Sequence, residues 1–276
     1  MADENDKGLL LGKNVAAVEH YSPEILYPIP RSSARESLGV ADSLPFFGED
    51  VWHAYEVSWL DETGKPQVRV GRITIPADSP NLVESKSIKL YLNSFNGEYI
   101  ADESSVVHSL EKDLSAAAGA PVNVALWTVD DAVFAGQSAA GTNIDGLQPT
   151  QQWSQPGRDI LRPSDSAAEP GAVALNSHLL RSLCPVTGQP DWATVCITYE
   201  SAAIDPVSLL EYIISFRTHQ EFHEQCVERI FIDLMSVYAP TQLSVQALYT
   251  RRGGLDICPW RSTLPGAAYA GRMNRQ

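Results

Sequence analysis

Two parts of this 276-residue sequence show the same order of apolar patterns, 121 or 122 residues apart. In each part alternating strand patterns come first, two helical stripes follow, and an alternating strand closes the set. Ser94-Phe95 and Ser215-Phe216 fall at matching places in the two first helices, and Ala125-Leu126 and Ala247-Leu248 match in the closing strands. The repeat predicts two copies of one α+β unit, with antiparallel sheets and helices on one face.

Along the first copy, the spacing of apolar residues changes from every second residue, as in a strand, to about every 3.6 residues, as in a helix. The apolar phase of its second strand slips near Gly71, which predicts a β-bulge. Its second helix is expected to stop at Gly119, two residues before Pro121. The predicted strands are 55–59, 68–75 and 122–129, and the predicted helices are 88–95 and 107–114.

The second copy has the same order, and a further strand is expected in each copy. Its predicted strands are 193–199 and 243–249, and its helices are 207–218 and 227–238. Gly, Ser, Gln, Asp and Pro dominate the stretch before it, as in a linker or an elaborated loop. We therefore expect an irregular N-terminal segment (1–45), a first module (46–130), a linker or elaborated loop (131–170) and a second module (171–276).

Charge and composition exclude several classes of partner. The net charge of −14, from 20 basic and 34 acidic residues, disfavours direct binding to nucleic-acid phosphates or to an anionic membrane. No run approaches the roughly 18 apolar residues of a membrane span, so a soluble, cytoplasmic protein is expected. The four cysteines, Cys184, Cys196, Cys226 and Cys258, form no Cys-x-x-Cys pair, so no metal site is predicted.

One cysteine stands in a run with the elements of nucleophilic chemistry. Cys184 is followed by a Gly188-Gln189-Pro190 turn and then by Asp191. A deprotonated thiol is a strong nucleophile, and the turn can bring a carboxyl group back toward it as a proton carrier. The alternative is a buried structural cysteine beside a loop aspartate, which residue types alone would favour. Cys196 and Cys226 are expected to be structural.

A second segment makes the nucleophilic interpretation of Cys184 stronger than the structural one. Glu84-Ser85-Lys86-Ser87-Ile88-Lys89 joins a carboxylate to two lysines three residues apart. Together with the Cys184–Trp192 run, Phe222-His223-Glu224-Gln225 and Arg251-Arg252-Gly253-Gly254, it resembles QueF, the NADPH-dependent 7-cyano-7-deazaguanine reductases of the queuosine pathway, in their longer, bimodular form. The resemblance implies two tandem tunnelling-fold (T-fold) modules, whose sheets join into barrels.

The resemblance also implies a role for each matching residue. Cys184 is the nucleophile that forms a covalent thioimide with the nitrile, and Asp191 is the proton donor. The implied substrate contacts are Val83, Glu84, Ser85, His223 and Glu224. The implied NADPH contacts are Ser85, Lys86, Arg252 and Gly253, with Lys89 a less certain addition. The implied partners are the small-molecule nitrile and a second copy of the chain in a homodimer.

Each of these residues also has a plain structural interpretation. Asp191 could be a turn residue after Pro190, and Glu224 a solvated carboxylate in the first turn of a helix. Lys86 and Lys89 could form a solvated basic face. No Gly-x-Gly-x-x-Gly follows a strand, so periodicity alone indicates no dinucleotide site.

Two other functions stay open at this point. A tunnelling-fold hydrolase acting on a pterin or a GTP-like ring would need a Cys/His zinc set to activate water. A non-catalytic purine-binding module would tolerate the loss of Cys184, which a reductase would not.

Overall fold

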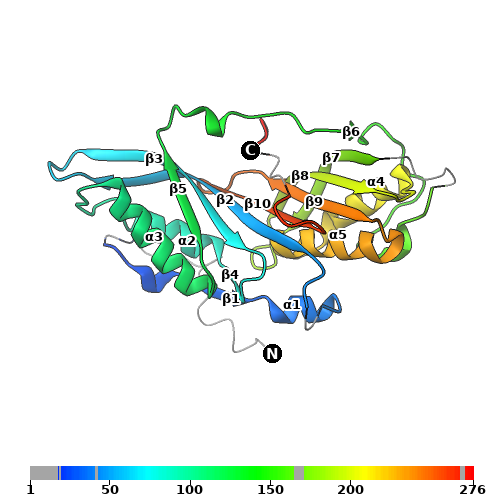
Figure 1. The fold of residues 1–276 in the computed structure, drawn as a ribbon, viewed down its shortest axis with the longest axis horizontal. Coiled ribbons are helices and arrows are strands. Elements are labelled where there is room, and N and C mark those ends of the chain that lie inside the picture. Colours follow the sequence, from blue (N-terminus) through cyan, green and yellow to red (C-terminus); the bar gives the residue numbers. More distant parts are fainter. Residues whose placement is uncertain (1–17, 19, 41–42, 165–170, 268–270) are drawn as a thin grey trace. The chain divides into compact units, whose positions relative to one another are not determined.

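The computed structural model describes residues 18, 20–40, 43–164, 171–267 and 271–276 (Figure 1). Contacts between Cα atoms divide the chain into two compact units, and we describe each by itself. Unit 1 is formed by 1–33, 51–133 and 251–256. Unit 2 is formed by 34–50, 134–250 and 257–276.

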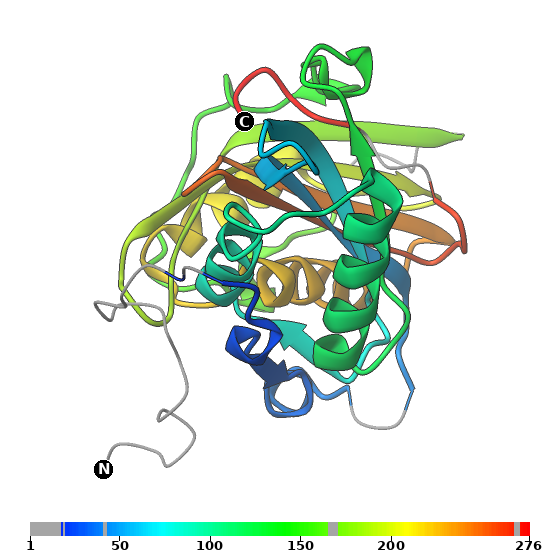
Figure 2. The ribbon, with the colours of Figure 1, turned by 90° about the vertical axis from the view of Figure 1, so that its left-hand side faces the viewer.

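Unit 1 is a small antiparallel sheet with two helices. The strand order is β5-β3-β2, and β1 pairs with β4 in a separate antiparallel pair. The elements are the 3-10 helix η2 (Pro23–Ile25), β1 (Pro28–Pro30), β2 (Phe47–Leu60, from Val51 on), β3 (Pro66–Pro76), β4 (Asn81–Val83), α2 (Ser85–Asn93), α3 (Glu103–Ala118) and β5 (Asn123–Trp127). Both views show α2 and α3 as neighbouring helices (Figures 1 and 2).

Unit 2 has a larger sheet in the order β10-β9-β8-β7-β6, antiparallel except for the β6–β7 pair. Its helices α4 and α5 lie together (Figure 1). The elements are α1 (Ser32–Ser37, from Ala34 on), the 3-10 helices η4 (Arg158–Ile160) and η5 (Phe216–Thr218), β6 (Thr142–Asn143), β7 (Ala172–Leu183), β8 (Pro190–Glu200), α4 (Pro206–Ser215), α5 (His223–Tyr238), β9 (Gln242–Tyr249) and β10 (Leu255–Ser262, from Ile257 on). The 3-10 helix η3 (Ala132–Phe134) begins in unit 1 and ends with the first residue of this part of unit 2. The chain is therefore α+β, as expected.

The repeat seen in the sequence extends to side-chain contacts between the two helices of each unit. The Tyr91 hydroxyl of α2 donates to Asp113 of α3 at 2.7 Å, and the Tyr212 hydroxyl of α4 donates to Asp233 of α5 at 2.7 Å. Each tyrosine also meets a phenylalanine edge-on, with ring centroids 5.3 Å and 5.4 Å apart. These buried bonds satisfy polar groups that would otherwise be costly inside the core.

The first helices of the two units also begin in the same way. The Glu84 side chain caps α2 by accepting the backbone N–H groups of Lys86 and Ser87. Asp205 caps α4 by accepting those of Val207 and Ser208. A carboxylate at this position satisfies N–H groups that lack partners within the helix and interacts favourably with the helix dipole.

The core of unit 2 contains a buried cluster of charges. Arg261 is fully buried, and its Nη2 atom lies 2.9 Å from both Glu228 and Asp50. Arg35 binds the same Glu228 at 2.7 Å. Burial alone would lower the pKa of Arg261, but the charges of Asp50 and Glu228 outweigh it and raise that pKa. Two cations therefore neutralise two buried carboxylates, as a buried charge requires.

Two expectations about local structure need correction, and the β3–β5 pairing bears on a third. The N-terminal segment is not wholly irregular, because η2, β1 and α1 lie within it. No bulge appears at Gly71 in the β3–β5 pairing, which is regular from Val70 to Thr74. Gly71 allows the Leu126 side chain of β5 to lie close to the backbone of β3, since a Cβ there would lie 2.9 Å from that side chain. The segment expected as a linker or elaborated loop contains η3, β6 and η4.

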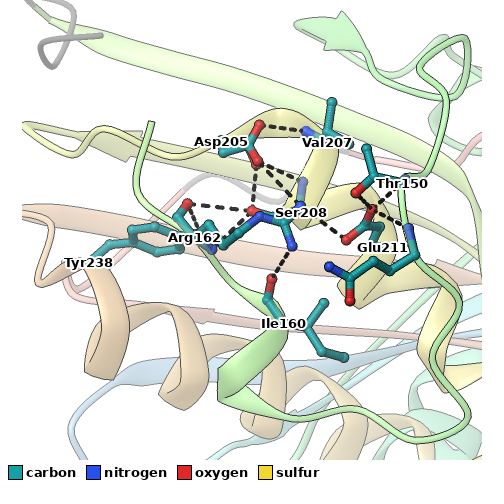
Figure 3. Close-up of polar contacts among 9 residues, drawn as sticks. Thr150, Ile160, Arg162, Asp205, Val207, Ser208, Glu211 and Tyr238 are labelled. Atoms are coloured by element: carbon teal, nitrogen blue, oxygen red, sulfur yellow. Dashed lines mark hydrogen bonds and ion pairs between the residues drawn. The ribbon is translucent and has the colours of Figure 1, made fainter. Parts of the chain in front are cut away.

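A single carboxylate, Glu211 of α4, fixes part of that segment in place. It accepts the Thr150 N–H at 2.6 Å, the Gln151 N–H at 3.0 Å and an Arg162 N–H at 3.0 Å. Arg162 also lies 3.6 Å from Asp205 (Figure 3). Burial alone would raise the pKa of Glu211, but the bonds from Thr150, Gln151 and Arg162 outweigh it and lower that pKa to about 2.

This lowered pKa makes the contribution of Glu211 to stability depend on pH. Because the carboxylate is favoured in the folded state, its contribution is complete above the ordinary glutamate pKa of about 4.3 and is lost as pH falls toward 2. We expect Glu211→Gln to lower the melting temperature at pH 6 and to differ progressively less from the wild type below pH 4.5. Thermal unfolding across this range checks it, with the exposed Glu36→Gln as control. A difference independent of pH would contradict the assignment.

Among the helices that the structure describes, none is long and apolar enough to cross a membrane.

Candidate active site

Cys184 lies in the tight connection between β7 and β8 in unit 2. Its N–H donates to the Gln189 carbonyl at 2.9 Å, and its carbonyl accepts the Gly188 N–H at 2.9 Å. Gly188 has a φ of +66°, which a residue with a side chain rarely adopts. The predicted turn is confirmed, and it holds Cys184, which is 4% exposed, on a hairpin with fixed backbone bonds.

The same hairpin places Asp191 opposite Ser182, two residues before Cys184. Asp191 is 3% exposed, and its Oδ2 atom lies 3.2 Å from Nε2 of His223, the first residue of α5. His223 stacks on Tyr249 of β9 with ring centroids 3.8 Å apart and planes 13° apart. The His223 Nδ1 atom is buried and has no hydrogen-bond partner among the described residues.

The contact between Asp191 and His223 argues against the interpretation of Asp191 as a turn residue. A turn residue would face solvent, whereas this carboxyl group is buried and bonded to an imidazole. A carboxyl–imidazole pair can hold and move one proton near a thiol. The structure therefore favours the chemical interpretation.

Three further residues lie beside this pair, and the sequence did not predict that they would. The Cys226 thiol of α5 lies near the hydroxyls of Ser182 and Tyr249, and neither hydroxyl makes a regular hydrogen bond with any described residue. Burial, followed by the charge of Glu221, raises the pKa of Cys226 well above its usual value. Cys226 therefore stays a neutral thiol. No sequence signal joins these residues, because they come from three separate elements.

Glu224, the second residue of α5, is 4% exposed. The interpretation as a solvated carboxylate is therefore wrong. Its position in the first turn puts it where exposed backbone N–H groups favour negative charge. A buried acceptor beside His223 suits recognition of the N–H edge of a flat base.

Unit 1 holds the other predicted substrate contacts at the junction of β4 and α2. Val83 ends β4, and Glu84 starts α2 with N–H bonds of 2.9 Å from Lys86 and 2.7 Å from Ser87. Glu84 is 1% exposed, and burial raises its pKa, although the two N–H bonds and the charge of Lys86 oppose that change. Each carboxylate oxygen has a second lone pair with which it could accept a further N–H.

Lys89 and the glycine after Gly253 both lie close to one side chain of unit 1, Glu56 of β2. Lys89, one helical turn after Lys86, forms an ion pair with Glu56. A Cβ on Gly254 would lie 2.5 Å from the Glu56 carboxyl carbon, so the loop of Arg252 and Gly253 passes close to the same group. Lys89 is thus paired with a carboxylate of the protein itself.

The backbone of that loop is shaped for close approach. Gly253 has a φ of +59°, and a Cβ built there would meet nothing within 4 Å, so the chain faces open space. Arg251 covers the Tyr55 ring at 3.6 Å from its centroid. Arginine beside left-handed glycines can offer both backbone N–H groups and a forked guanidinium to an anion, including a dinucleotide phosphate.

Two family descriptions match this chain. The N-terminal part of nitrile reductase, 7-cyano-7-deazaguanine-reductase, matches residues 17–126, and the QueF-like protein family matches residues 190–265. A protein of Chromohalobacter salexigens named NADPH-dependent 7-cyano-7-deazaguanine reductase is 49% identical over 267 residues, which are 95% of each chain. The protein of that name from Dechloromonas aromatica is 51% identical over 92% of this chain and 89% of its own.

The chain belongs to the QueF family. A solved structure of the archaeosine synthase QueF-Like is 18% identical over 34% of this chain and 94% of its own, with a TM-score of 0.32, which is too low to support an argument. The first QueF match contains Val83–Lys86, and the second contains Asp191, His223, Glu224, Arg252 and Gly253. Cys184 lies six residues before the second match.

Proposed function

We propose that this QueF-family chain reduces the nitrile of 7-cyano-7-deazaguanine to the aminomethyl group with NADPH, in queuosine biosynthesis. The relatives that share about half of its residues are named for this activity. The observation that carries the proposal is a buried thiol on a fixed hairpin whose next strand holds a buried carboxyl group, paired with the imidazole at the start of α5. Nucleophile and proton carrier are what a nitrile requires.

The first step forms one bond and moves one proton. The Asp191 carboxylate accepts the proton of Cys184, and the thiolate adds to the electrophilic nitrile carbon. One π pair of the C≡N bond moves to nitrogen, which takes the proton from Asp191, and a covalent thioimide results. His223, 3.2 Å from Asp191, holds the carboxyl group in place and stabilises its charged form.

Reduction of a nitrile to an amine needs two hydrides, and NADPH supplies them when it is bound. In this proposal Ser85, Lys86, Arg252 and Gly253 hold the cofactor. The nitrile-bearing base is held by Val83, Glu84, Ser85, His223 and Glu224, with the two carboxylates accepting its N–H groups.

The division of the chain into two modules is part of the same proposal. Each unit has two helices beside an antiparallel sheet and the same internal contacts, which supports two tandem tunnelling-fold modules. The boundaries at 46–130 and 171–276, the homodimer, the cytoplasmic location and the lack of direct nucleic-acid binding stay predictions.

The ratio of NADPH consumed to nitrile reduced tests the proposed reductase activity. We expect purified protein to consume two NADPH for each nitrile reduced, measured by absorbance of NADPH and mass spectrometry of the product. Activity should survive prolonged chelation. Binding without NADPH consumption would favour the purine-binding module, and a requirement for stoichiometric zinc would favour the hydrolase.

Removing the charge of either base-binding carboxylate should weaken nitrile binding. We expect Glu224→Gln and Glu84→Gln each to cost about 1.5–3 kcal/mol, roughly 10- to 150-fold in Kd, because each deletes a charged, buried acceptor. Calorimetry with the nitrile alone measures this, with the exposed Glu62→Gln as control. Unchanged affinity in both variants would exclude the assignment.

A further inference from the structure

A cavity of about 600 Å³ in unit 2 has no part in the proposed reaction. Its lining residues are 149–154 on one side and Glu211, Ile214, Arg217 and Thr218 on the other. A volume of this size lies within the range of small-molecule sites. Its lining joins an indole and an isoleucine to amide, hydroxyl, carboxylate and guanidinium groups.

The walls of this cavity are held by hydrogen bonds across it. Glu211 accepts the N–H of Thr150 (Figure 3) and that of Gln151, both of which also line the cavity. The Thr218 hydroxyl donates to the Ser154 carbonyl at 2.8 Å. In the same wall the indole N–H of Trp153 is buried and has no partner in the described structure. A pre-formed cavity loses little conformational entropy when a ligand enters.

One end of the cavity carries a concentration of positive charge. Arg217 lines the cavity, and its guanidinium carbon lies 5.4 Å from the ring centroid of Trp192. Arg181 and Arg275 approach the same ring at 5.6 Å and 5.7 Å. Any two of these guanidinium carbons are therefore no more than about 11 Å apart, so all three charges lie around one side chain.

These three arginines have no acidic partner among the residues that the structure describes. Arg181 donates to the Arg217 carbonyl and Arg275 to the His178 carbonyl, while the Nε atom of Arg181 is buried without a partner. By contrast, Arg69, which stacks on Trp59 at 5.4 Å, is paired with Glu103 at 2.5 Å.

Three unpaired cations around one indole repel each other, and the chain as a whole carries −14. A bound anion removes this repulsion. Guanidinium groups offer forked pairs of N–H donors that match phosphate oxygens. The Trp192 ring orients the groups, since arginine stacks readily on an aromatic face.

We propose that the cavity and the Arg181–Arg217–Arg275 cluster form a nucleotide site, with the phosphate on the guanidinium groups and the uncharged body in the cavity. The site takes a phosphate monoester or diphosphate attached to a flat, polar ring. The phosphate belongs either to NADPH or to a separate nucleotide, and both present the same chemistry to the arginines. The inference does not depend on the reductase activity.

Calorimetry on the full chain tests this site with AMP, adenosine and inorganic phosphate as probes. We expect AMP to bind at least about tenfold more tightly than adenosine, and more weakly as salt rises. The double variant Arg217→Gln/Arg275→Gln changes two exposed side chains, so the fold should be kept. It should weaken AMP binding by about tenfold or more. The matched control is Arg69→Gln, an arginine over tryptophan that has its own carboxylate, and it should bind AMP as the wild type does.

A second arm identifies the source of the phosphate. If AMP competes with NADPH and the double variant also weakens NADPH binding, the cofactor occupies the site. If AMP still binds at saturating NADPH, the site takes a separate nucleotide. No AMP binding at millimolar concentration, unchanged binding in the double variant, or an equal loss in Arg69→Gln would overturn the proposal.

Discussion

Cys184→Ala is expected to lower nitrile reduction by about 10³-fold or more and to abolish the covalent adduct with the nitrile. The reason is that no described side chain near Asp191 can take its place. Cys226, the other thiol near this pair, is buried in α5, and its raised pKa keeps it protonated. Cys184 alone stands on the hairpin that carries Asp191 on its next strand.

Intact-mass spectrometry of protein mixed with the nitrile, without NADPH, measures the adduct directly. The wild type should gain the mass of one whole nitrile per chain. The control is Cys196→Ala, which removes a half-buried strand thiol whose pKa burial raises to about 11, and it should keep both adduct and turnover. An adduct that persists in Cys184→Ala, or near wild-type turnover, would show that another group is the nucleophile.

Asp191→Asn is expected to reduce turnover by about 10²–10⁴-fold while changing nitrile affinity little. Asparagine keeps the size of the side chain and an oxygen near His223, but it can neither accept the thiol proton nor deliver it to nitrogen. Because the carboxyl group is buried and bonded to His223, no solvent-exposed acid can replace it.

Single-turnover kinetics and calorimetry separate these two effects. Adduct formation should slow in the variant, whereas the Kd of the nitrile should stay within about threefold. Asp159→Asn, an exposed aspartate of η4, serves as the control for loss of a carboxylate. Equal turnover in Asp191→Asn and wild type would assign the proton to a different group.

The helices were the most predictable part of the fold. Their apolar stripes and caps are local signals, so α3 ends at Gly119 in the left-handed conformation, as the sequence indicates. β7 was expected only as a further strand without bounds, because the register shift between Ser177 and Leu180 interrupts its alternation. β10 was also not predicted. All eight of its residues are buried, including Asp256 and Arg261, although charged residues in a sequence usually indicate exposed positions.

The site was predictable only where its residues are close in sequence. The turn between Cys184 and Asp191 follows from Gly188 and Pro190, whose backbone preferences are local. The contact between Asp191 and His223, and the stacking of His223 on Tyr249, depend on how a helix packs against a sheet. Nothing in a single sequence states that packing. The same holds for the three arginines around Trp192, which come from β7, η5 and the C-terminal residues.

The two matched helix starts have a consequence for how many ligands one chain can hold. Among the described residues, the Glu84 side chain meets backbone N–H groups and the charge of Lys86, whereas Asp205 is also ion-paired with Arg162 from the segment between the two repeats. The two copies therefore differ. In the first, the capping carboxylate can still accept a base, whereas in the second the capping carboxylate is ion-paired with Arg162. Titration should therefore saturate at one nitrile per chain, although the chain contains two copies of the fold element that could bind it.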